Sequence, residues 1–245
     1  MLSTMSGWLF TQAMAAPLWV VTAATLLWFS FIYVLIAGGA YLLAIRHVPD
    51  TVAAGGRAQR LRPGQLREEL LLSALSIVIF AAQAAGLVWL LRHGWLSIDW
   101  QRSAWHLVWE LPVLYLWNDV HFFVIHRALH WKPLYRSVHI WHHRSVITTP
   151  FSAYSFHPLE SFLLGSVMPL ALVLHAFSPW ALLGLTVMSL LLNVSGHLPH
   201  EQIRDGFSLL RPHSRYHNRH HREFHTHYAF SLVWLDRWLA GSPKP

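Results

Sequence analysis

The sequence predicts an all-α integral membrane protein with four to five transmembrane helices and a helical, histidine-rich cap on the cytoplasmic side. Of the 245 residues, 54% are hydrophobic and only 12% are charged, whereas a soluble domain carries about 25% charged residues. Several apolar stretches approach the roughly 20 residues that a helix needs to cross the hydrocarbon core. The 19 histidines outnumber the 18 lysines and arginines, and some of them form dense clusters.

The apolar stretches predict where the chain crosses the membrane. Residues 18–45 have no small-residue cleavage site, so they predict an anchor rather than a signal peptide. Residues 70–91 predict a second span, and residues 104–125 a third span that carries polar side chains. Residues 159–194 are divided at Phe177-Ser178-Pro179 into two short halves, which predicts a hairpin that crosses and returns. Residues 48–64 predict a connector.

The basic residues predict the orientation of these spans. Sixteen of them lie in residues 46–67, 127–144 and 204–244, and only Arg92 and Arg102 lie between the other spans. Because basic loops stay in the cytoplasm, this predicts five crossings with the N-terminus outside. The formal charge of +7 indicates contact with membrane lipids and not with nucleic acid, because no nucleic-acid motif accompanies it.

Three histidine clusters have the spacing of metal ligands on helices. On a helix, positions i, i+3 and i+4 share one face, so each cluster is expected to aim its imidazoles at one point. Chance gives roughly 0.1 His-x-x-His-His patterns in a chain with this histidine frequency, and this chain has two. Eight nitrogen ligands exceed the need of one metal and predict a dinuclear site in the cap with open positions. The clusters are His126 and His130; His139, His142 and His143; and His217, His220 and His221.

The roles of other histidines follow less directly from their spacing. His197, at the cytoplasmic end of the hairpin, is predicted as a ninth metal ligand. His157 is left open between a ligand and a hydrogen-bond partner of a ligand. His200, His225 and His227 receive no assigned role. Disulfides, zinc–thiolate sites and iron–sulfur clusters are excluded, since the chain has no cysteine.

Two carboxylates, Asp119 and Glu160, are predicted to act at the metal site as hydrogen-bond partners of the ligand histidines. A ligating histidine usually donates its second N–H to a carboxylate or carbonyl, and Asp119 precedes His126 by two helical turns. The alternative for Asp119 is an ion pair with Arg127 or a helix cap. Glu201, Glu223 and Asp236 are weaker candidates for the same task.

These motifs resemble those of the fatty acid hydroxylase/sterol desaturase superfamily. The resemblance covers about residues 110–240 and includes His157-Pro158-x-Glu160 and a tyrosine, Tyr216, before the last cluster. It implies transmembrane helices under a cytosolic cap with a non-haem di-iron centre, held by the eight clustered histidines with His197 at a ninth matching position. The chain ending departs from the family pattern at His227-Tyr228-Ala229-Phe230.

The resemblance implies a function and a division of the chain. Residues 1–105 would form the membrane anchor and connector, and residues 106–245 the catalytic region. The expected reaction is hydroxylation of a fatty acyl, sterol or related isoprenoid lipid, with desaturation on the same site as the alternative. It would use two iron ions, which zinc can replace in a purified sample, and O2 as co-substrate.

No nicotinamide, flavin or haem motif is visible, so a separate ferredoxin or cytochrome would supply the electrons. Two further classes compete with an oxygenase. A metal-binding transporter would place its histidines along the spans, and a haem-binding subunit could use only His121 and His175. A bacterial inner membrane is the expected location, because the chain is short and carries no retention signal.

Overall fold

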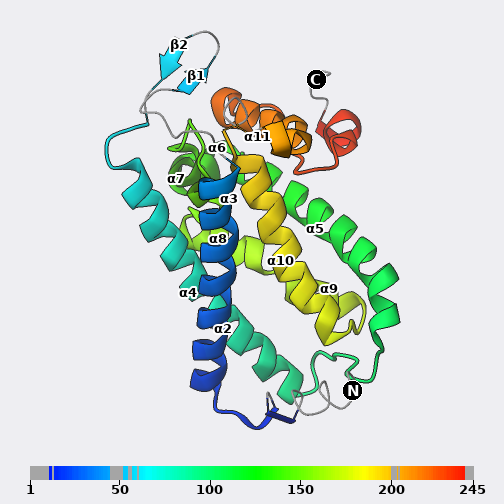
Figure 1. Cartoon of the computed structure of the whole chain (residues 1–245). Helices are drawn as coiled ribbons and strands as arrows, with labels where there is room; N and C mark the ends of the chain where they lie inside the picture. Colours follow the sequence, from blue (N-terminus) through cyan, green and yellow to red (C-terminus); the bar gives the residue numbers. More distant parts are fainter. Residues whose placement is uncertain are drawn as a thin grey trace.

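The structure, a computed structural model, is a bundle of helices capped at one end by short helical segments (Figure 1). It describes residues 11–12, 14–44, 52–54, 57–59, 61–199, 203 and 205–240. The long helices are α2 (Leu18–Tyr33) continued by α3 (Gly39–Leu43), α4 (Gln65–Arg92), α5 (Leu107–Leu129) and α10 (Pro179–His197). The shorter helices are α6 (Lys132–Leu134), α7 (Ile140–His143), α8 (Pro158–Gly165), α9 (Val167–Leu174) and α11 (Arg211–Glu223).

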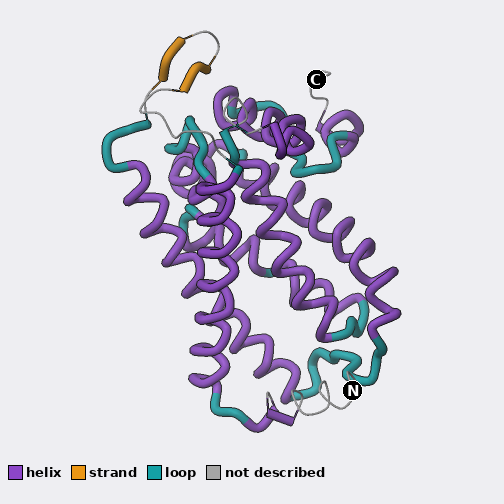
Figure 2. Tube along the Cα trace, in the orientation of Figure 1, coloured by secondary structure: helices purple, strands orange, loops and turns teal. Residues whose placement is uncertain are grey.

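Short helical segments of other types link these helices. The π-helical segments are Val34–Gly38, Tyr135–His139 and Asp236–Ala240, and the 3-10 segments are Ala104–His106, Pro150–Tyr154 and Asp205–Leu210. The described chain contains one departure from an all-α fold, seen as the orange segments of the tube in Figure 2. Strands β1 (Val52–Ala54) and β2 (Arg57–Gln59) pair antiparallel inside the predicted connector, so the all-α prediction was wrong there.

Three of the described helical segments are long and apolar enough to cross a membrane, which makes the chain a membrane protein. They are Leu18–Leu43, Gln65–Arg92 and Pro179–His197. α5 has the length of a span, but its buried Glu110 and Asp119 make it more polar than these three. The pair α8–α9 forms a shorter apolar segment, Pro158–Leu174. The structure therefore supports three of the four to five predicted crossings by length and composition.

The hairpin prediction is confirmed at its turn. Pro179 is the first residue of α10, and the Ser178 hydroxyl caps the helix by accepting a hydrogen bond from Ala181 N at 3.2 Å. Buried Glu110 accepts hydrogen bonds from Ser178 N at 3.1 Å and from Arg102 at 2.7 Å. This end of the bundle is therefore closed by polar contacts and lies opposite the cap.

The apolar core joins the helices in two layers. In the layer next to the cap, α2, α4 and α10 pack around the segment Pro150–Tyr154 through Tyr33, Phe80 and Leu190. In the other layer, Leu87 of α4 and Leu114 of α5 contact α9 and α10. Many apolar side chains of α2 point outward, such as Trp19 and Leu27, which are 73% and 71% exposed. An apolar outer surface around a packed interior suits a hydrocarbon environment.

Candidate metal centre

All nine histidines that the sequence singled out as ligands lie together at the cap end of the bundle. His126 is in the last turn of α5, and His130 directly follows that helix. His142 and His143 end α7, His197 ends α10, and α11 carries His217, His220 and His221. Eight of these nine side chains are buried, and His130 is partly buried. Four helix ends therefore converge on one interior region.

The nine histidines form two separate groups, and within each group the potential ligand nitrogens lie within 4.8 Å of one another. The expectation that each cluster aims at a single point holds for His126 and His130 and was wrong for the two His-x-x-His-His clusters. On a helix, residues i and i+4 point in directions about 40° apart, whereas residues i+3 and i+4 differ by about 100°. Each His-x-x-His-His cluster therefore contributes its first and last histidines to one group and its middle histidine to the other. The first group is His126, His130, His139, His143 and His220, and the second is His142, His197, His217 and His221.

The ring nitrogens of each group face one another closely. In the first group, Nε2 of His143 lies 3.1 Å from Nε2 of His139 and 3.2 Å from Nε2 of His220. In the second, Nε2 of His197 lies 3.2 Å from Nε2 of His142 and 3.1 Å from Nε2 of His217. Each group therefore concentrates nitrogen atoms around one small volume.

The opposite ring nitrogens determine which tautomer these histidines adopt. Nδ1 donates to a backbone carbonyl in four of them: His126 to Tyr228 at 2.8 Å, His142 to Ser155 at 3.2 Å, His197 to Asn193 at 2.7 Å and His220 to Thr226 at 2.5 Å. A carbonyl only accepts, so Nδ1 carries the proton and Nε2 of a neutral ring presents a lone pair. His142 and His197 then face each other lone pair to lone pair, which is repulsive unless a cation lies between them.

Burial keeps these imidazoles neutral. Loss of solvation, reinforced by neighbouring imidazoles, holds the pKa of His139, His142 and His143 well below its usual value near 6.5. The same causes lower the pKa of the three α11 histidines well below that value. Since the neutral imidazole is the metal-binding form, the residues present fit two divalent cations. Imidazole suits iron, zinc and copper alike, so the ligand type alone does not select the metal.

Glu160 lies where the sequence placed it, beside His139, one of the histidines predicted as ligands. Its Oε1 accepts a hydrogen bond from Nδ1 of His139 at 2.8 Å, and both side chains are buried. The second oxygen, Oε2, has no partner among the described residues. A carboxylate in this position orients the imidazole and makes it a stronger ligand.

Asp119 has a different position from the one expected. Its oxygens accept hydrogen bonds from the Ser231 backbone N at 3.1 Å and from the Ser231 hydroxyl. It therefore binds the C-terminal segment rather than a histidine, and it forms neither of the alternatives, an ion pair with Arg127 or a helix cap. The reason is distance along the helix: Asp119 shares its face of α5 with His126 but lies about 10 Å from it along the axis, where it meets Ser231 instead of a histidine.

Asp236, a weaker candidate from sequence for bonding a ligand histidine, also binds the C-terminal segment rather than a histidine. It accepts hydrogen bonds from the backbone N of Tyr228 at 2.9 Å, from that of Ala229 at 2.7 Å and from the Tyr216 hydroxyl. Together, Asp119 and Asp236 hold the segment whose Tyr228 carbonyl accepts from His126. The carbonyl groups of Ser155, Asn193, Thr226 and Tyr228 were missed, because a backbone acceptor leaves no signal in the residue type.

The remaining histidines lie outside both groups. His157 caps α8, with Nδ1 accepting from Leu159 N at 3.1 Å, and its ring packs edge-on against Trp141. His225 is exposed, and Nδ1 of buried His227 lies 2.7 Å from the Thr226 hydroxyl. Glu223 pairs with Arg219 at 2.8 Å. His200 and Glu201 lie outside the described residues.

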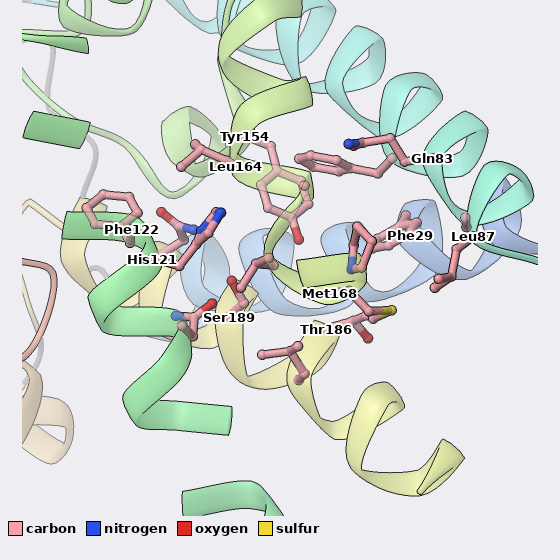
Figure 3. A pocket seen from close by; sticks show the side chains of 18 of the residues that line it. Phe29, Gln83, Leu87, His121, Phe122, Tyr154, Leu164, Met168, Thr186 and Ser189 are labelled. Carbon is pink, nitrogen blue, oxygen red and sulfur yellow. The ribbon is translucent and has the colours of Figure 1, made fainter. Parts of the chain in front are cut away.

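An apolar cavity lies between the helices next to this centre (Figure 3). It contains about 800 Å³ of empty space, part of it open to the surroundings. Two of its wall residues also touch the metal centre: Phe122 packs on His126 and Phe156 on His142, with ring centroids 4.9 Å and 5.0 Å apart. The cavity therefore ends beside both histidine groups.

Comparison with known proteins agrees with this geometry. A family model described as fatty acid hydroxylase matches residues 111–241, more than half of the chain. The chain is similar to the Delta(7)-sterol 5(6)-desaturase of Candida dubliniensis, with 36% identity over 56 residues, which are 23% of this chain and 14% of that protein. The same enzyme of Saccharomyces cerevisiae is 34% identical over 88 residues, covering 34% and 24% of the two chains.

A Delta(7)-sterol 5(6)-desaturase of Aspergillus fumigatus is 29% identical over 132 residues, covering 48% of this chain and 39% of that protein. The matches thus span less than half the length of each of these curated relatives. No solved structure matches the chain.

Proposed function

Because the chain belongs to the fatty acid hydroxylase family, we propose that it is a membrane-bound di-iron oxidoreductase that introduces a double bond into a lipid. The observation that carries this proposal is the convergence of nine histidines in two groups at the end of a membrane helix bundle. A transporter would distribute such ligands along its spans near the membrane midplane.

Desaturation replaces hydroxylation as the leading reaction. The three similar proteins are named as sterol desaturases, and they support the alternative reaction expected from the sequence more than the main one. Both reactions begin by breaking a C–H bond, and they differ in whether oxygen is added or a second hydrogen is removed. The shape of the substrate site therefore decides between them.

The two iron ions would be held by the first and second histidine groups, with Glu160 supporting His139. When bound, they supply the oxidising power, drawn from O2 and external electrons, that breaks an unactivated C–H bond. The role of the chain is to hold neutral imidazoles in place, exclude water and present the lipid. Phe122 and Phe156 would do the last two tasks, because each lines the cavity and covers a ligand histidine.

The substrate would enter from the membrane, and the electrons would come from a separate ferredoxin or cytochrome. Apolar residues of α2, α4, α9 and α10, such as Phe29, Leu87, Met168 and Leu185, line the cavity, which suits the hydrocarbon part of a lipid. The distribution of basic residues supports a cap on the cytoplasmic side. The bacterial inner membrane gains no support, because the three similar desaturases come from fungi.

Lipid analysis of cells that express the protein tests this function. We expect the intact chain, supplied with iron, O2 and a redox partner, to yield a lipid that is two hydrogens lighter than its precursor. The double variant His142→Ala/His143→Ala removes one ligand from each group and should abolish that product. A product that is one oxygen heavier would instead indicate hydroxylation, and no new lipid from the iron-loaded protein would refute an oxidative role.

A further inference from the structure

The side-chain oxygen of Asn193 is a buried acceptor that no described residue satisfies. Its side chain is 6% exposed, and its Oδ1 has no hydrogen-bond partner among the described residues. The residue also lines the apolar cavity. A buried acceptor without a partner is unfavourable, so a group that enters the cavity and donates to it would be bound selectively.

Asn193 lies at the end of the cavity that meets the metal centre. It precedes His197 by one helical turn, and its backbone carbonyl accepts from Nδ1 of His197 at 2.7 Å. Thr186 and Ser189 continue the same face of α10 away from the centre. Figure 3 shows Ser189 with His121 and Phe122 at one side of the cavity, and Phe122 packs on His126.

A second polar group lies at the other side of the cavity, where Figure 3 shows Gln83 above Phe29 and Leu87. Its Nε2 donates to the Phe162 carbonyl at 2.9 Å, whereas its Oε1 is buried without a described partner. The cavity therefore offers two places for a polar group of a ligand, one beside the metal centre and one away from it. Only the first would bring the polar group close to the reacting carbon.

We propose that the Asn193 amide binds a hydroxyl group of the lipid substrate, which therefore carries this hydroxyl close to the carbon that is oxidised. This inference rests on the proposed function and narrows its substrate class. A fatty acyl chain that reacts along its length has its polar group far from the reacting carbon, whereas a hydroxylated ring lipid can have the two only a few bonds apart. Asn193 would then be a specificity-determining residue.

The test compares the binding of two probes that differ only in the hydroxyl group, cholestanol and cholestane, to the zinc-loaded protein in detergent. Zinc keeps the site filled but prevents turnover, so the readout is affinity and not activity. We expect the wild type to bind cholestanol about tenfold more tightly than cholestane, as one buried hydrogen bond can provide. Asn193→Leu should bind both equally, and Gln83→Leu should keep the preference.

Asn193→Ala serves as a second variant with a smaller change of shape, and both variants should retain the zinc content of the wild type. An unchanged preference in the Asn193 variants, or its loss in Gln83→Leu instead, would overturn the inference while leaving the proposed function intact. Failure of the wild type to bind either probe would count against a lipid site in this cavity, and so against the proposed function and the inference together.

Discussion

Glu160 is a carboxylate that accepts a hydrogen bond from His139, a proposed metal ligand, at 2.8 Å. Replacing it by glutamine keeps its size but removes the negative charge that makes the imidazole a stronger ligand. We expect Glu160→Gln to weaken metal binding about 10–100-fold, measured by competition with a chelator. Asp99→Asn is the matched control, because Asp99 pairs with Arg102 far from the cap; equal metal affinity in both variants would contradict the role of Glu160.

The buried histidines predict how the metal-free protein responds to pH. Burial lowers the pKa of His139, His142 and His143 below the value near 6.5 of an exposed histidine, so the unfolded chain binds more protons below that pH. Their contribution to stability is therefore complete above about pH 6.5 and is lost as the pH falls towards the lowered values. The thermal midpoint of metal-free protein should drop between about pH 7 and pH 5, and a midpoint independent of pH would refute this.

The histidine residues made most of the site predictable from sequence. Histidine has few reasons to recur at helical spacing other than metal binding, so the nine residues that now lie in two groups could be singled out from sequence. The role of Asp119 could not be predicted, because helical spacing gives the face of α5 but not the segment that packs on it. In the structure that segment contains Ser231, which lies 112 residues away along the chain.

At the scale of elements, the segment from Thr226 to Ser231 acts as a support for α5 and α11. Its carbonyls accept from His126 and His220, and Asp236 holds it through Tyr228 and Ala229. The positions of the spans were predictable from hydropathy, since α4 contains the apolar stretch 70–91 and α10 begins at Pro179, where the hairpin was expected to turn. The β1–β2 hairpin was not, because its residues show no alternating apolar pattern that would predict strands.

Asp236→Ala tests this support. The change removes an acceptor from two backbone N–H groups and from the Tyr216 hydroxyl. The loss of a hydrogen bond to a charged group lowers the free energy of unfolding by at most about 1.5–3 kcal/mol. We expect a lower thermal midpoint and weaker retention of metal by the first group. His225→Ala is the control, since that side chain is exposed; a variant with the midpoint and metal content of the wild type would show that the support is dispensable.

At the scale of the whole molecule, the membrane helices and the cap together form one site, because the cavity between the helices ends at the histidines of the cap. Ala84 of α4 lines this cavity, whereas Ala82 of the same helix is exposed on its outer side. Ala84→Phe should fill the cavity and abolish the lipid product while the metal content is unchanged. Ala82→Phe should leave both unchanged, and full activity in Ala84→Phe would exclude the cavity as the substrate site.

The central claim is that the nine histidines form two separate metal sites, and metal stoichiometry tests it most directly. After reconstitution with ferrous iron, the wild type should hold two ions per chain. The variant His217→Ala/His221→Ala, which removes two ligands of the second group only, should hold about one. A single ion in the wild type, or the loss of both ions on changing the second group alone, would contradict the account.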